Sequence, residues 1–266
     1  MVASRDYAKE FLGIINKSSG KHSTYQLFRD FVGLSSRSIS NQRFLYNQKL
    51  EDEYLDIAKK YSKEELSRMG ELLALTFMAL SQRSYDFLGH CYMSLGLGNE
   101  RAGQFFTPYH VCQFMARINY LDKLPDTGYF SVQDPAVGSG GMLIAYAENL
   151  QNQGYKLEEQ LLCSGIDIDA LVAEMAYIQL SILNVPAEIY VGDSLSGKYS
   201  RVYYTPAYIT FSHAQKTSHK PINDSTQENI NTVLAEPQID STKVAKPIVE
   251  DTKLKAKTNV PQLSLF

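Results

Sequence analysis

A glycine-rich turn and three aspartates are the residues of this chain whose types and spacing best suit ligand chemistry. The turn, Gly138-Ser139-Gly140-Gly141, lies between a strand-like run, Tyr129 to Gln133, and an apolar segment with a helical pattern, and Asp134 follows the strand-like run directly. Glycines allow dihedral angles and a close approach that a Cβ would obstruct, so backbone amides and a helix N-terminus can lie against a polar ligand group. A turn of this kind can also be purely structural, and both interpretations stay open on these residues alone.

The turn departs from two phosphate-binding motifs. Leu143 stands where the dinucleotide-binding pattern has its third glycine, and no Gly-Lys-Ser/Thr is present, as an ATP-binding loop requires. Two further aspartates, Asp167 and Asp193, each follow an apolar segment that is typical of a strand. In α/β nucleotide sites an acid at the end of the second strand holds ribose hydroxyls. Asp169 opens the next helical segment and is better explained as its N-cap.

Four segments occur together in a characteristic order: GQFFTP at 103–108, DPAVGSGGML at 134–143, GIDID at 165–169 and GDSL at 192–195. In this order they resemble the modification subunit of type I restriction-modification systems, within the amino-methylating (N6-adenine) DNA methyltransferases. The resemblance covers about residues 85–211 and includes a helical lead-in, Tyr85-Asp86-Phe87-Leu88-Gly89.

The resemblance implies S-adenosylmethionine as the cofactor. The residues that it implies in cofactor binding are Gly138 and Gly140 in the turn, Phe105, Thr107 and Pro108 toward the methionine end, Asp134 near the amino group, Asp167 at the ribose and Asp193 at the adenine edge. The Thr-Pro step is expected to start a helix, with Thr107 as N-cap and Pro108 at the first helical position.

The catalytic segment is expected after the fourth strand. Methylating an exocyclic amine is difficult because its lone pair is delocalised into the base, and family members use an Asn-Pro-Pro-aromatic segment that accepts the amine hydrogens and stacks on a flipped-out base. This chain has Thr205-Pro206-Ala207-Tyr208 at that place. The predicted catalytic residues are therefore Thr205, Pro206 and Tyr208. The alternative is that this stretch is only the fourth strand and its exit loop, which leaves catalysis open.

Hydrophobic periodicity predicts an α/β fold. We expect a helical N-terminal region (1–100) and then a sheet of about four strands (101–212). The resemblance implies that this is a truncated, Rossmann-like S-adenosylmethionine-dependent methyltransferase sheet, with the edge beside the fourth strand uncovered. The resemblance also implies that the N-terminal helices help to clamp DNA or contact a partner subunit; the alternative is that they simply cap the core. Residues 213–261 are polar and aperiodic, which predicts a disordered linker because too little apolar surface can be buried.

Composition restricts the partners and the compartment. The chain has 266 residues, with 26 Lys and Arg against 29 Asp and Glu. DNA-binding proteins usually carry a basic excess or patch, so we expect weak binding to DNA by the chain alone and a specificity or other modification subunit as partner. Three cysteines without paired spacing favour a reducing cytoplasm and no metal site. The resemblance implies a protein that is bacterial or encoded by a phage or plasmid. Cys112 and Cys163 are expected in the core, and no apolar run suits a signal peptide or a membrane span.

The last five residues form a short apolar motif, Gln262-Leu263-Ser264-Leu265-Phe266. The motif is similar to the Gln-Leu-x-Leu-Phe peptide by which bacterial replication and repair proteins bind the sliding clamp. In that resemblance Gln262 fills a polar subsite, and Leu263, Leu265 and Phe266 fill an apolar pocket. The alternative is that the peptide docks as a strand on the chain's own core.

Three functional interpretations follow. The leading one is a S-adenosylmethionine-dependent, adenine-specific DNA methyltransferase of the modification-subunit kind. The second is a non-catalytic, cofactor-binding adaptor that the C-terminal peptide recruits to the sliding clamp. The third is the product of a decaying gene, which would fold poorly.

Overall fold

The computed structural model describes residues 5–41, 46–98, 106–119, 123–218 and 262–264. Within them the helices are α1 (Tyr7–Ser18), α2 (Thr24–Ser40), α3 (Gln48–Ala58), α4 (Lys63–Gln82), α5 (Phe87–Ser94), α6 (Tyr109–Ile118), α7 (Gly141–Asn152), α8 (Leu157–Gln160), α9 (Ala170–Ile182) and α10 (Pro206–Ser218). The strands are β1 (Phe130–Asp134), β2 (Leu161–Asp167), β3 (Ala187–Asp193), β4 (Lys198–Tyr204) and β5 (Gln262–Ser264).

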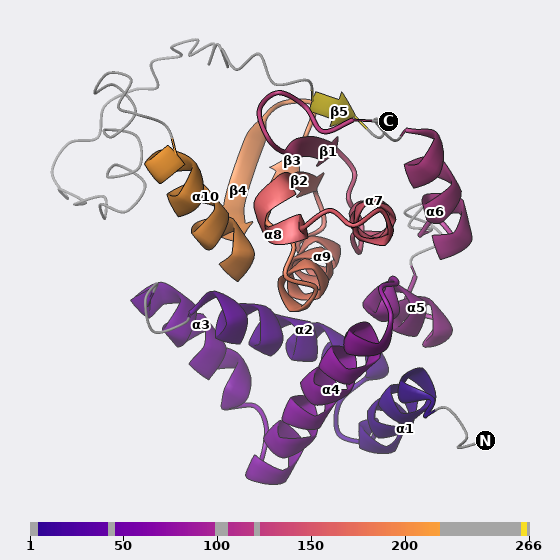
Figure 1. Ribbon diagram of the computed structural model, residues 1–266. Coiled ribbons are helices and arrows are strands. Elements are labelled where there is room, and N and C mark those ends of the chain that lie inside the picture. The colour runs from indigo at the N-terminus through magenta and orange to yellow at the C-terminus, as the bar shows by residue number, and fades with distance from the viewer. Residues whose placement is uncertain (1–4, 42–45, 99–105, 120–122, 219–261, 265–266) are drawn as a thin grey trace, which may run out of the picture. The chain divides into compact units, whose positions relative to one another are not determined.

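The strands form one mixed sheet in the order β4-β3-β2-β1-β5 (Figure 1). Strands β1, β2, β3 and β5 are parallel, and β4 runs antiparallel to β3. In this register Val132 lies opposite Cys163, which lies opposite Ala187 on the next strand. The carboxyl ends of β1, β2 and β3 therefore meet at one edge of the sheet, whereas β4 ends at the opposite edge.

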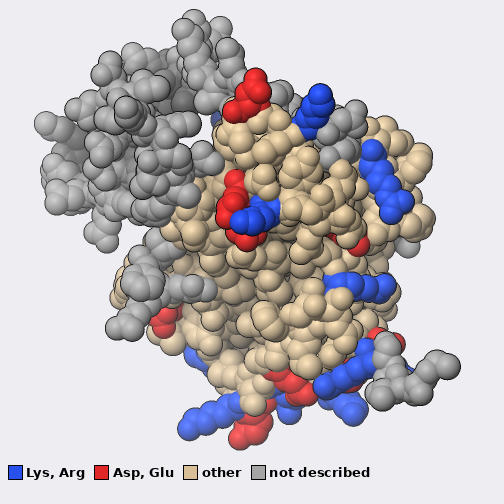
Figure 2. Space-filling model, viewed as in Figure 1, with Lys and Arg blue, Asp and Glu red and all other residues tan. Residues whose placement is uncertain are grey.

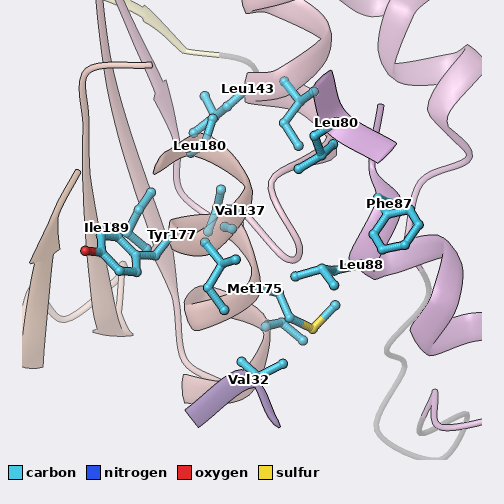
Figure 3. Packing of buried hydrophobic residues seen from close by; sticks show 14 of the residues in the cluster. Val32, Leu80, Phe87, Leu88, Val137, Leu143, Met175, Tyr177, Leu180 and Ile189 are labelled. Carbon is cyan, nitrogen blue, oxygen red and sulfur yellow. The ribbon is translucent and has the colours of Figure 1, made fainter. Parts of the chain in front are cut away.

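Helix α9 lies between the sheet and the N-terminal helices. Every residue from Leu171 to Leu180 is buried, as expected for a helix that is apolar on all sides. It packs against β3 on one side and α2 on the other. Figure 3 shows Tyr177 beside Ile189 of β3, and Met175 close to Val32 and Leu88. One continuous core thus joins the helical region to the sheet.

The N-terminal helices begin at side-chain caps and pack through aromatic rings. Helix α4 starts with a capping box, in which Ser62 and Glu65 each bond the other's backbone N–H. The buried ring of Phe11 meets the rings of Phe31 and Phe87 edge-on, at centroid distances of 5.4 and 5.5 Å. These contacts hold α1, α2 and α5 together.

A network of ion pairs also ties the helical region to the sheet. The Arg37 guanidinium lies 2.7 Å from the Glu174 carboxylate of α9 and 3.1 Å from Glu53 of α3. Glu53 pairs in turn with Arg201 of β4, and the Tyr203 hydroxyl donates to Glu174 at 2.7 Å. Because these groups are largely buried, losing one partner would leave an uncompensated charge in the core.

The predicted fold class is confirmed: an α/β protein with a helical N-terminal region before its sheet. Two details differ. The fourth strand is antiparallel and leads directly into α10, not into an exit loop, and α10 includes 213–218 of the predicted linker. The rest of that linker, 219–261, lies outside the described residues. Among the residues that are described, no helix has both the length and the apolar character needed to cross a membrane.

Candidate cofactor site

The glycine turn lies at the carboxyl end of β1 and needs its glycines. Gly138 and Gly140 have φ angles of 53° and 96°, in the left-handed region. A Cβ on Gly140 would also lie 3.1 Å from the Cβ of Ala176 on α9. The Gly140 carbonyl accepts the first helical bond of α7, from the N–H of Ile144 at 2.9 Å. The turn is therefore held in one conformation at the start of α7, with Gly138 its most accessible residue and Ser139 to Gly141 buried.

Asp134 and Asp167 lie beside the turn. Asp134 is buried, and burial together with the nearby Asp167 carboxylate raises its pKa to about 6. Asp167 accepts hydrogen bonds from the N–H groups of Gly138 and Asp169, both at 2.9 Å, and burial raises its pKa as well. The charged groups that act on these two acids are other carboxylates. The site is thus electronegative.

Asp193 lies at the end of β3, at the same edge of the sheet. Its carboxylate accepts a hydrogen bond from the N–H of Leu195 at 2.9 Å, and this bond lowers its pKa. Asp193 is therefore ionised at neutral pH.

Two apolar side chains stand in solvent next to these acids. Ile168, directly after Asp167, is 77% exposed, and Leu195, two residues after Asp193, is 98% exposed. Single exposed apolar residues are common, but these two flank the same edge of the sheet. They offer apolar surface to a planar ligand group, and the sequence analysis did not single them out.

A buried acid of the helical region holds the turn in place. Asp86 accepts hydrogen bonds from the Ser139 hydroxyl at 2.5 Å, from the Gln179 amide at 2.9 Å and from the N–H of Gly89 at 2.9 Å. The Gln179 amide also donates to the Ser139 carbonyl, and its oxygen accepts from the N–H of Leu88. Burial raises the pKa of Asp86. The segment noted only as a helical lead-in thus connects the turn to α5 and α9.

The Thr-Pro segment lies over the turn. The Phe106 ring is the nearest group to a Cβ built on Gly138, at 3.5 Å. Helix α6 begins at Tyr109 with Pro108 in the N-cap position, because the ψ angle of Pro108 is 134° and places it outside the helix. The expectation that Thr107 is the N-cap and Pro108 the first helical residue was therefore wrong by one position. Phe105 lies outside the described residues.

Thr205 lies at the opposite edge of the sheet from the turn. Strand β4 is antiparallel, so its last residues pair with the start of β3, where Tyr204 lies opposite Glu188. The Thr205 hydroxyl donates to the Val185 carbonyl at 2.8 Å and accepts from the N–H of Ala187 at 2.9 Å. Thr205 is fully buried. These hydrogen bonds give Thr205 a structural role. Its burial at the edge opposite the turn does not support the predicted catalytic role.

The other two predicted catalytic residues, Pro206 and Tyr208, also lie away from the turn. Pro206 is the first residue of α10. The Tyr208 ring stacks on Tyr204, with centroids 4.9 Å apart and an interplanar angle of 26°. Burial, and then the nearby Glu188 carboxylate, raise the pKa of Tyr208. The structure thus brings Asp134, Gly138 and Asp167 together but leaves Thr205–Tyr208 at the far edge.

The C-terminal motif pairs with the free edge of β1. Gln262 and Leu263 belong to β5, in which Leu263 lies opposite Val132 in parallel register. This is the arrangement of the alternative interpretation, in which the peptide adds a strand to the chain's own core. Leu265 and Phe266 lie outside the described residues.

Comparison with known proteins identifies the family. The family model for N-6 DNA methylase matches residues 83–263, which is more than half of the chain. The chain belongs to the N-6 DNA methylase family. This assignment confirms the predicted resemblance, and S-adenosylmethionine is the cofactor that it implies. No curated protein matches the chain.

Three solved structures share a more distant likeness. A protein assigned as a class I S-adenosylmethionine-dependent methyltransferase from Listeria monocytogenes is 15% identical, with 72% of this chain and 55% of that chain covered and a TM-score of 0.37. A type I restriction-modification methyltransferase subunit from Streptococcus thermophilus is 16% identical, with 68% and 55% covered and a TM-score of 0.32. A protein assigned as a type I modification subunit from Vibrio vulnificus is 26% identical, with 49% and 25% covered and a TM-score of 0.28.

This chain spans about half the length of the first two structures and a quarter of the third. All three TM-scores lie below 0.5, so the family assignment comes from the sequence match alone.

Proposed function

We propose that this N-6 DNA methylase binds S-adenosylmethionine over the Gly138 turn. The observation that supports this most strongly is the pair of acids, Asp134 and Asp167, whose neighbouring charges are again carboxylates. Such a site repels phosphates and favours a cationic ligand. S-adenosylmethionine carries both a sulfonium and an ammonium group, whereas a nucleoside phosphate is anionic.

The roles that the family resemblance implies are compatible with the places of these residues around the turn. Asp134 would meet the ammonium group, Asp167 the ribose hydroxyls and Asp193 the adenine edge, with Ile168 and Leu195 as apolar neighbours of the adenine ring. Both oxygens of Asp167 already accept one N–H bond, and each carboxylate oxygen can accept another. Thr107 and Pro108 would lie toward the methionine end. When bound, the cofactor supplies the electrophilic methyl group.

We propose DNA as the methyl acceptor, within an assembly of the type I modification-subunit kind. The chain carries a net charge of −3, and Figure 2 shows acidic and basic side chains interspersed on the face in view, with a middle region that has few of either. Phosphate neutralisation provides most non-specific affinity for DNA, so a partner such as a specificity subunit would supply much of the contact. Adenine-specific transfer would then use residues other than Thr205, Pro206 and Tyr208.

Calorimetric titration with S-adenosylmethionine tests cofactor binding. We expect saturable binding by the full chain, at least tenfold weaker in Asp167→Asn, because the variant removes a charge and an acceptor oxygen at the turn. Asp126→Asn is the matched control, since Asp126 is an exposed aspartate in the segment before β1. A folded wild-type chain that gives no heat of binding, or an Asp167→Asn variant that binds like the wild type, would refute the proposed site.

A second candidate function is recruitment to the sliding clamp through Gln262–Phe266. It is favoured by the motif itself, which would dock in a groove of the clamp, and binding would require Gln262–Ser264 to leave their pairing with β1. The test is a pull-down on immobilised clamp with the full chain and with a chain lacking Gln262–Phe266. Equal retention of both chains, or of neither, would exclude this function.

A further inference from the structure

A cleft of about 1020 Å3 opens beside the cofactor site. It is bounded by the start of α1, the end of α4, helices α5 and α6, and Glu148 of α7, which lie on one side of the molecule in Figure 1. Its volume suits a ligand of nucleotide size. Asp134, Gly138 and Asp167 are not among its lining residues, and it borders the cofactor site at Phe106–Pro108 and at Asp86, which accepts a hydrogen bond from Ser139 of the turn. It is therefore a second site with its own chemistry.

One wall of the cleft is an aromatic platform. The Arg83 guanidinium lies 4.4 Å from the centroid of the Tyr85 ring. The Tyr85 ring is held edge-on against the buried Phe87, with centroids 5.8 Å apart and an interplanar angle of 86°. An ordered, half-buried aromatic ring beside an arginine is the usual stacking surface for an unpaired base, because every base has a π-face.

The opposite wall carries hydrogen-bonding groups of the kind that bind a base edge. Glu148 Oε2 accepts from the Tyr109 hydroxyl at 2.9 Å and from the Gln113 amide at 2.8 Å. These two bonds hold the carboxylate in place, and within the described part of the chain Oε1 makes no hydrogen bond. Oε1 is thus an acceptor for an exocyclic amine.

The exposed lining of the cleft carries both signs of charge. Arg83, His90 and His110 are exposed there, and so is Asp6. Arg83 forms no salt bridge to any residue that the structure describes, so its guanidinium can attract a phosphate of a nucleic-acid backbone.

We propose that this cleft binds an unpaired nucleotide of a nucleic-acid strand. The base stacks on the Arg83–Tyr85 platform, its edge meets Glu148, and a flanking phosphate lies beside the Arg83 guanidinium. The site is separate from the cofactor site, and its occupation does not depend on S-adenosylmethionine.

Fluorescence anisotropy with a labelled single-stranded thymidine 15-mer tests the stacking and phosphate parts of the site. We expect saturable binding by the full chain, about tenfold weaker in Tyr85→Ala, because stacking on one aromatic ring contributes about that factor. Tyr85→Phe keeps the ring and is expected to bind like the wild type. Arg83→Ala is expected to weaken binding and to reduce its dependence on salt.

Phe77→Ala serves as the matched control, since Phe77 is exposed on α4 and does not line the cleft. Circular dichroism of each variant shows that it is folded. No binding by the wild-type chain, or unchanged binding by both Tyr85→Ala and Arg83→Ala, would overturn the proposal. Equal affinity for duplex and single strand would overturn it too, because paired bases cannot enter the cleft. A chain that binds the oligonucleotide but gives no heat with S-adenosylmethionine would refute the proposed function and leave this site standing.

Discussion

Replacing Asp134 by asparagine should stabilise the fold and weaken cofactor binding. The Asp134 side chain is 1% exposed, and burial raises its pKa from 3.8 to about 6. At neutral pH the folded chain therefore holds a carboxylate that would be better solvated in the unfolded chain. Asparagine has the same shape, and its Oδ1 can keep the 3.0 Å bond from the N–H of Ala136.

The magnitude follows from the difference between the two pKa values. A rise from 3.8 to about 6 corresponds to a destabilisation of about 3 kcal/mol at pH 7, taken as an upper limit. The sign follows from proton binding. The folded state binds the Asp134 proton more tightly than the unfolded state does. The destabilisation by the Asp134 carboxylate is therefore absent below pH 3.8, grows as pH rises, and reaches its full size above about pH 6. The variant carries no charge at any pH.

Urea unfolding of the wild type and Asp134→Asn should be measured at pH 7 and near pH 4. We expect a higher free energy of unfolding for the variant at pH 7, by up to about 3 kcal/mol, and nearly equal values near pH 4. Calorimetry at pH 7 should show weaker binding of S-adenosylmethionine by the variant, because the buried carboxylate that lowers the stability of the fold is also the group that binds the cofactor. A variant that is less stable at pH 7, or a difference that does not shrink on acidification, would refute this account.

Three further predictions concern stability. Gly140→Ala should lower the free energy of unfolding by at least ~2 kcal/mol, because the new Cβ adds both backbone strain and a clash with α9. Gly154→Ala is the control, since Gly154 also has a positive φ angle but no atom lies within 4 Å of a Cβ built on it. Equal decreases in the melting temperature of the two variants would contradict the argument from crowding. Arg37→Met should destabilise the fold by ~3 kcal/mol in urea, because it leaves Glu174 uncompensated in the core; a loss below ~1 kcal/mol, typical of an exposed pair, would contradict this. Thr205→Val should lower the free energy of unfolding by ~1–3 kcal/mol, yet leave calorimetric affinity for S-adenosylmethionine unchanged; a selective loss of affinity would show that the threonine acts at the cofactor site.

The cofactor side of the site was predictable because its determinants are local. A glycine turn after a strand, and acids at the ends of parallel strands, must meet at one edge of the sheet once the strands pair. Asp134, Gly138 and Asp167 therefore lie together as their positions in the sequence indicated. The exposed Ile168 directly follows Asp167, and Leu195 lies two residues after Asp193; an apolar residue just past a strand end was the signal that could have identified them.

The place of Thr205 could not be predicted, because it depends on the direction of one strand. A short turn after Asp193 makes β4 a hairpin partner of β3 and not a parallel strand, and this reverses the edge at which its last residue lies. The number of residues between Asp193 and Thr205 is the same whether β4 runs parallel or antiparallel to β3, so the sequence spacing does not reveal the direction. The role of Asp86 was equally hidden, because its partners Ser139 and Gln179 are distant in sequence and only packing brings them together.

The pairing of β5 with β1 has a consequence for how the chain is made. Ser131 and Gln262 are neighbours in the sheet, yet one is synthesised long before the other. At roughly 5–20 residues per second, the ribosome needs about 7–26 s to reach the second after the first. During that time β1 presents an unpaired edge, which is a template for pairing with another chain. Pairing of β5 with β1 is thus a non-local strand addition that can only follow the synthesis of both segments, and association of another chain with the β1 edge would compete with it.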